Sequence, residues 1–138
     1  AHRVGGLEKD FLKGTVSHDP TNHQRMVDIR AAKVQRVQEF IPEQQVIGDP
    51  EGDLLVIGWG GTFGHLFDAV QEMRANGKKV SLCHFNYINP MPKNVADIFG
   101  RFKKLVVCEL NMGQFANHLR MNYQQFNYLQ YNLSLIHI

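Results

Sequence analysis

A glycine-rich segment, Gly58–Gly64, has the composition of a loop that could bind a phosphate group. It follows a short apolar run and precedes a helical pattern, the arrangement in which backbone N–H groups meet an anion. A dinucleotide-binding turn has glycine at its first, third and sixth positions, but the sixth position here is Phe63, and the acidic residue expected about 20 residues later is missing. No Gly-Lys-Ser/Thr follows the glycines, which excludes a Walker phosphate loop. We interpret the segment as a tight turn with Thr62 as the helix cap.

A carboxylate, Glu109, follows the apolar run 105–108 at the predicted carboxyl end of a strand, where α/β proteins gather their sites. It could act as a base, or it could accept hydrogen bonds from the turn amides of Met112 and Gly113. Because no histidine or serine partner lies near Glu109 in sequence, we favour capping or a subunit contact as its role. For the same reason we favour structural roles for Ser81 and Thr62 over roles as nucleophiles. No catalytic residue is therefore predicted. For cofactor binding, only Gly60, Gly61, Thr62 and Glu109 are kept as loop candidates.

A metal site could be sought among the cysteines and histidines, namely Cys83, His84, Cys108, His65 and His118. Cys83 and His84 are adjacent on a predicted strand and therefore point to opposite faces, and Cys108 belongs to another strand. No Cys-x-x-Cys or His-x-x-x-His pair is present, and His18 and His23 are poorly spaced for chelation. We predict no metal site and no iron–sulfur cluster in these residues.

The elements that position these residues alternate between strand and helix. Residues 1–18 have the pattern of a connecting loop with room for one hairpin, and 43–52 have the composition of a linker. Between them, Asp19-Pro20 begins a helix that Pro42 ends, and an apolar stripe recurs along it at helical spacing, at Val27, Ala31, Val34 and Ile41. Strands are predicted at 54–57, 79–85, 105–108 and, as an edge strand, 127–132. Helices are predicted at 63–75, at 95–102 with Asn94 as its cap, and at 114–123. This order predicts an α/β fold with a mostly parallel sheet and flanking helices.

Composition narrows the function classes. The chain has 138 residues with 43% hydrophobic and 20% charged residues, which is typical of a globular domain, and its formal charge of +2 with no basic run argues against nucleic-acid binding. No apolar run reaches the roughly 20 residues of a membrane span. Two cysteines inside apolar runs favour buried reduced thiols and hence a cytoplasmic location. Because the chain begins at Ala1 in the middle of a loop pattern, we expect residue 1 to be a cut inside a longer polypeptide.

Five segments in order resemble the alpha subunit of 2-oxoacid:ferredoxin oxidoreductases. The resemblance as a whole covers residues 3 to 132, and it is greatest to the 2-oxoglutarate type, often called 2-oxoglutarate synthase. The matching segments are 6–10 (GLEKD), 22–30 (NHQRMVDIR), 58–62 (GWGGT), 87–94 (YINPMPKN) and 109–114 (ELNMGQ).

The resemblance implies a transketolase C-terminal-like domain, core domain II, of a thiamine diphosphate enzyme. Such an enzyme converts 2-oxoglutarate, coenzyme A and oxidised ferredoxin into succinyl-CoA, carbon dioxide and reduced ferredoxin. The thiamine cofactor would lie between an upstream pyrimidine-binding domain of the alpha chain and the beta subunit, which also supplies magnesium and the iron–sulfur clusters. None of the residues implied for those groups falls in this sequence. The domain's expected work is structural support and subunit contact.

The resemblance also divides the chain. Residues 1–52 would be the interdomain linker and helix, 53–132 would be core domain II, and 133–138 depart from the family pattern as an artefactual or divergent tail. Tyr87, Trp59, Phe63 and Met112 are of types that populate interface cores. The alternative function is a free-standing α/β module that binds a nucleotide or coenzyme A, and a scaffold without an enzymatic parent is a further alternative.

Overall fold

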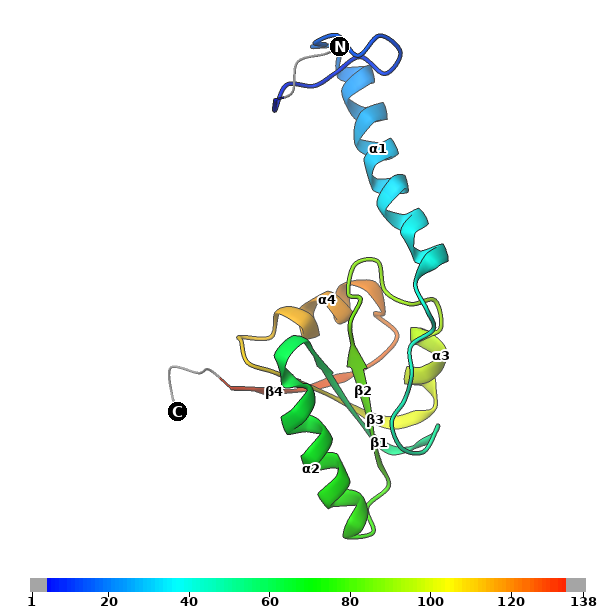
Figure 1. The fold of residues 1–138 in the computed structure, drawn as a ribbon, viewed down its shortest axis with the longest axis vertical. Helices are drawn as coiled ribbons and strands as arrows, with labels where there is room; N and C mark the ends of the chain where they lie inside the picture. Colours follow the sequence, from blue (N-terminus) through cyan, green and yellow to red (C-terminus); the bar gives the residue numbers. More distant parts are fainter. Residues whose placement is uncertain (1–4, 134–138) are drawn as a thin grey trace. The chain divides into compact units, whose positions relative to one another are not determined.

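The computed structural model describes residues 5–133, and the chain divides into two units, 1–41 and 42–138 (Figure 1). In the first unit, α1 (Pro20–Arg36) begins where the Asp19 carboxylate accepts hydrogen bonds from the amides of Thr21 and Asn22. The helix ends at Arg36 and tightens into the 3₁₀-helix η1 (Val37–Phe40), so the α-helix predicted up to Pro42 is shorter than expected.

A short hairpin packs beside α1 within the first unit. Lys9 pairs with Val16 in an antiparallel bridge, as the predicted hairpin requires. The Glu8 carboxylate binds Arg30 and lies 2.8 Å from His23 Nδ1, while the Arg25 guanidinium lies 3.5 Å from the centre of the Phe11 ring. None of the described residues up to 41 is buried: in the apolar stripe predicted for this helix, Val27 and Val34 are 39% and 44% exposed and Ile41 is half-buried.

The second unit is built on a four-stranded parallel sheet with the order β2-β1-β3-β4. Its strands are β1 (Gly52–Trp59), β2 (Val80–Phe85), β3 (Phe102–Glu109) and β4 (Tyr128–Asn132), and the helices between them are η2 (Gly60–Thr62), α2 (Phe63–Ala75), α3 (Val95–Gly100) and α4 (Gln114–Asn122). The parallel α/β fold and the edge position of the last strand are thereby confirmed.

Two apolar clusters cover the two faces of the sheet. On one face, α3 and α4 pack over all four strands around Phe85, Phe99 and Phe115, and the rings of these three residues meet edge to face. On the other face, α2 places Val70 against Val56, Val80 and Leu82. Cys83 belongs to the first cluster and Cys108 packs against the second, so the two thiols lie on opposite faces of the sheet and are free.

Residues predicted as a linker run beside the free edge of β2. The backbone of Ile47 exchanges two hydrogen bonds with Leu82, at 2.8 and 2.9 Å, and the Ser81 hydroxyl donates to the Asp49 carbonyl. Asn94, predicted to cap α3, occupies the cap position, but its side chain instead exchanges hydrogen bonds with the backbone of Gln44. The Asn94 side-chain amide thus binds a residue 50 positions earlier in the sequence, because the chain before β1 passes within hydrogen-bonding distance of it.

Candidate functional site

The carboxyl ends of the parallel strands bring two of the predicted segments together. The glycine turn after β1 and the turn after β3 face each other across a small cavity of about 220 Å³. The cavity is lined by Trp59, Gly60, Gly61, Thr62, Leu110 and Asn111. This juxtaposition is what parallel strands predict, because their carboxyl ends meet at one edge.

The glycine turn is stabilised by its own hydrogen bonds. Gly60 has φ +61°, a left-handed conformation that favours glycine. The Thr62 hydroxyl donates to the Trp59 carbonyl at 2.8 Å and accepts from the Trp59 amide at 3.2 Å. The prediction of Thr62 as the helix cap is therefore correct in position and wrong in bonding. Its side chain bonds back to Trp59 rather than to α2 because the 3₁₀ turn η2 brings the Trp59 backbone to the hydroxyl.

Glu109 is the polar side chain most deeply enclosed at this edge, with 2% of its surface exposed. Its two carboxylate oxygens accept hydrogen bonds from the amides of Phe115 and Ala116, both at 2.9 Å, and the Trp59 indole N–H lies 3.4 Å from the same carboxylate. Capping was predicted at Met112 and Gly113. Glu109 instead caps the first turn of α4, further along the chain. The amides of Gly113 and Gln114 donate to the side-chain oxygen of Asn111, so the Glu109 carboxylate accepts from the amides that follow them.

These bonds restrict what the edge can do chemically. Both Glu109 oxygens are occupied by backbone donors, so the carboxylate is held as a structural acceptor rather than presented as a base. The same bonds fill the amino end of α4, where an anionic ligand would otherwise find unpaired N–H groups.

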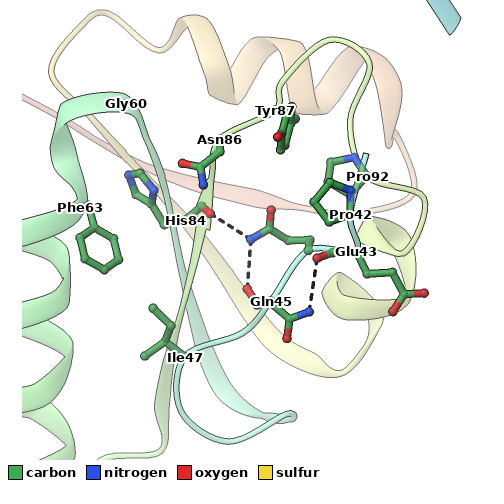
Figure 2. A pocket seen from close by; sticks show the side chains of 11 residues that line it. Pro42, Glu43, Gln45, Ile47, Gly60, Phe63, His84, Asn86, Tyr87 and Pro92 are labelled. Atoms are coloured by element: carbon green, nitrogen blue, oxygen red, sulfur yellow. Dashed lines mark hydrogen bonds between the residues drawn. The ribbon is translucent and has the colours of Figure 1, made fainter. Parts of the chain in front are cut away.

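A larger open groove, with a volume of about 590 Å³, lies beside the carboxyl end of β2 (Figure 2). Phe63 and His84 stand on one side and Pro42 and Pro92 on the other, with Tyr87 at the rim. Burial lowers the pKa of His84, because the charged ring would lose solvation there. The lining of the groove consists of amide, aromatic, aliphatic and proline side chains with one carboxylate, Glu43, and it includes no lysine or arginine, which disfavours a phosphate group there.

Sequence reasoning missed part of this groove. Gln44 bonds through its side-chain amide to the carbonyls of His84 and Gln45, so it joins the chain before β1 to the end of β2. A polar residue in a glycine- and proline-containing stretch carries no signal of such a contact. Tyr87 was named from its residue type as an interface candidate, whereas Asn86 was not named, although its position directly after a predicted strand could have indicated it.

The metal candidates do not converge. Within residues 5–133, no three His, Cys, Asp or Glu side chains are placed to hold one ion. His84 contacts Phe63 and Thr62, whereas the His118 ring lies 2.8 Å from the Ile88 carbonyl on another element. Burial raises the pKa of both Cys83 and Cys108, which disfavours the thiolate form that metals bind. Among the described helices, none is both long enough and apolar enough to cross a bilayer.

Comparisons with known proteins give consistent results. The family described as pyruvate:ferredoxin oxidoreductase core domain II matches residues 52–135. The 2-oxoglutarate oxidoreductase subunit KorA of Mycobacterium tuberculosis is 43% identical over 124 residues, which are 88% of this chain and 18% of that protein. The alpha subunit of 2-oxoacid:ferredoxin oxidoreductase 1 from Aeropyrum pernix is 27% identical over 115 residues, 78% of this chain and 18% of that protein.

A solved structure is similar over nearly the whole chain. It is a 2-oxoglutarate:ferredoxin oxidoreductase from Magnetococcus marinus with 2-oxoglutarate, coenzyme A and succinyl-CoA bound, and it matches with a TM-score of 0.85 and 29% identity. The match covers 97% of this chain and 24% of that one. The chain thus spans 18% of the length of the two curated relatives above.

Proposed function

This chain belongs to the pyruvate:ferredoxin oxidoreductase core domain II family, and we propose that it is a supporting and subunit-contact domain in the alpha subunit of a 2-oxoacid:ferredoxin oxidoreductase. The 43% identity to a 2-oxoglutarate oxidoreductase subunit favours 2-oxoglutarate as the substrate of the parent enzyme. The parent reaction would convert 2-oxoglutarate, coenzyme A and oxidised ferredoxin into succinyl-CoA, carbon dioxide and reduced ferredoxin.

The supporting role rests on one observation: the polar side chains at the carboxyl edge of the sheet make hydrogen bonds within the domain. Glu109 binds two helix amides, Thr62 binds the Trp59 backbone, and Asn111 binds the amides of the next turn. Each of these bonds holds a turn in place. The Thr62 hydroxyl also lies 3.4 Å from His84 Nε2, but its shorter bond, at 2.8 Å, goes to the Trp59 carbonyl, so its proton is held by the backbone rather than by the imidazole. We therefore assign no catalytic residue to this chain, and the loop positions Gly60, Gly61, Thr62 and Glu109 are proposed to shape a contact surface.

The cofactors implied by the family do not fit the described residues. Thiamine diphosphate requires a metal-held diphosphate, and an iron–sulfur cluster requires several thiolates. The described part of the chain offers no converging metal ligands, and the amino end of α4 is filled by Glu109. We propose that thiamine diphosphate, magnesium and the clusters belong to the upstream pyrimidine-binding domain and to the beta subunit.

A contact surface is available at the carboxyl edge. Tyr87, Phe63 and Met112 expose 47%, 44% and 85% of their surfaces there, although such side chains are usually buried at least in part. Aromatic residues and methionine are enriched in protein interfaces. We propose that these side chains pack against the beta subunit, and that coenzyme A and ferredoxin meet the holoenzyme elsewhere.

Substitution of the glycine turn tests this role. Gly60→Val forces a β-branched residue into φ +61°, whereas Gly61→Val changes the same type of residue where no positive φ is needed and no atom lies within 4 Å of the added Cβ. We expect Gly60→Val to reduce co-purification of the beta subunit with the alpha subunit, while Gly61→Val leaves it nearly unchanged. Undiminished complex with lost turnover in Gly60→Val would contradict the proposal.

Two further elements of the proposal concern extent and place. We propose that core domain II occupies residues 53–132, that 1–52 join it to a preceding domain, and that 133–138 form a tail, of which 134–138 lie outside the described residues. The free thiols Cys83 and Cys108 support a location in the cytoplasm, where cysteines stay reduced.

Calorimetry of the chain with NAD, ATP and coenzyme A separates the supporting role from that of a free-standing ligand-binding module. Saturable heat is expected for the module and not for the supporting domain.

A further inference from the structure

The two faces of the sheet are covered unequally. On the α3–α4 face, buried side chains extend across all four strands to Tyr128 on β4. On the opposite face, α2 is the only helix within residues 42–133, and its buried contacts are with β1 and β2, while Val106 and Cys108 of β3 pack half-buried against the side of that cluster. Parallel sheets are normally covered on both faces, because their strands are apolar on both sides. Beyond these half-buried contacts, the β3–β4 half of this face has no helix of its own within residues 42–133.

The uncovered half is apolar and hollowed. Strand register pairs Val106 with Leu129 and Cys108 with Tyr131, and alternation along β4 places Leu129 and Tyr131 opposite the buried Tyr128. Leu129 and Tyr131 are 57% and 62% exposed. A cavity of about 380 Å³ lies beside them, lined by Thr62, His65, Leu66, Cys108, Glu109, Leu110, Tyr131 and Leu133. We call these side chains of β3 and β4, together with this cavity, the open face.

The dimensions of the open face indicate what would cover it. Two neighbouring strands are about 10 Å wide, and a helix with its side chains has a diameter of about 10–12 Å, so one helix fits beside α2. The lengths of β3 and β4, 8 and 5 residues, correspond to about 16–26 Å. A helix of about 11–17 residues has that length, and α2, which covers the other half of the face, has 13 residues.

We propose that the open face is the docking site of one amphipathic helix from the remainder of the parent alpha subunit. This inference rests on the proposed function, since it requires a longer polypeptide. The curated relatives above extend over more than five times the matched length, because the match covers 18% of each. A segment of the same polypeptide binds at a high effective concentration, so it occupies the face more readily than a separate protein does. Its apolar stripe would fill the cavity at Leu66, Cys108 and Tyr131.

Thiol labelling at the open face tests the docking. Tyr131→Cys is made together with Cys108→Ser, so that the two thiols cannot pair across the strands, and Gln71→Cys in the same background is the control because Gln71 is exposed on α2 outside the cavity lining. N-ethylmaleimide is applied to the 138-residue chain and to the full alpha subunit purified without other subunits. Peptide mapping measures the rate at each site, and the buried Cys83 serves as an unreactive reference.

We expect the thiol at 131 to react at least about tenfold more slowly in the alpha subunit than in the chain, since protection follows the population of open states. The thiol at 71 is expected to react at similar rates in both. Equal rates at 131, or protection at 131 that appears only when the beta subunit is added, would overturn the proposal. Neither result depends on turnover, so a failure here is distinguishable from a failure of the proposed function.

Discussion

Replacing Glu109 with glutamine tests whether this carboxylate holds the edge of the sheet together. The carboxylate is 2% exposed and accepts from two helix amides at 2.9 Å. Glutamine has the same size but offers one oxygen and one NH₂ group. The amides of Phe115 and Ala116 meet different oxygens of Glu109, so in glutamine one of them faces the NH₂ group, a second donor, in a nearly buried site.

The magnitude follows from those two bonds. A hydrogen bond to a charged group contributes about 1.5–3 kcal/mol, and a buried amide left without an acceptor costs about 1–3 kcal/mol. These two quantities overlap because they describe one lost contact, so we expect Glu109→Gln to lower the free energy of unfolding by about 1.5–3 kcal/mol. A solvent-exposed cap would be worth less, typically about 1 kcal/mol.

Urea unfolding of the chain measures this difference. Trp59 is the single tryptophan, and its indole N–H lies 3.4 Å from the same carboxylate, so its fluorescence reports on this edge directly. Glu72→Gln is the matched control, since it makes the same chemical change at an exposed position of α2 and should stay within about 0.5 kcal/mol of the parent chain. Equal stability of Glu109→Gln and Glu72→Gln would refute the assignment of Glu109 as the acceptor that anchors α4.

Two further predictions concern other parts of the chain. Gly58→Ala should destabilise the second unit by about 1–3 kcal/mol, because the added Cβ would collide with the Leu66 side chain and lie 2.9 Å from the Thr62 hydroxyl. Gly64→Ala is the control: it lies in open space on α2 and should be neutral or stabilising by up to about 1 kcal/mol. If urea unfolding showed Gly64→Ala to be the less stable of the two variants, this packing would be contradicted. The hydrogen bond from Arg30 holds the pKa of Glu8 at about 2, below its ordinary 4.5. Because the pKa is lowered in the folded chain, the contacts of Glu8 are fully present above pH 4.5 and are lost as pH falls through about 2; an NMR titration midpoint near 4.5 would show that the ion pair does not form.

The sequence was sufficient to predict the sheet because local patterns determine it. Four apolar runs separated by helical patterns left few arrangements other than parallel strands with right-handed connections. The meeting of the glycine turn with the Glu109 turn followed from that topology. The apolar stripe of α1 could not be interpreted as fully. An apolar pattern at helical spacing predicts that one face of the helix is covered, but it does not predict which residues cover it.

The details of the site depend on contacts that sequence spacing does not specify. Asn94 was predicted to cap the helix beside it, but it binds Gln44, 50 positions earlier. Glu109 reaches the amides of α4 because the intervening turn folds back, with Gly113 at φ +96°. Ile47 pairs with Leu82 through a single bridge, too short for any periodicity to indicate. Each case is a side chain or backbone group satisfied by a distant segment, and only the three-dimensional path of the chain reveals it.

The central claim is that this domain supports an enzyme whose reactive groups lie in other segments. Calorimetric titration of the purified chain with thiamine diphosphate in the presence of Mg²⁺ tests it most directly. We predict no saturable heat, because the described residues offer no converging metal ligands and Glu109 fills the amino end of α4. Saturable binding of thiamine diphosphate by the chain alone would contradict the account.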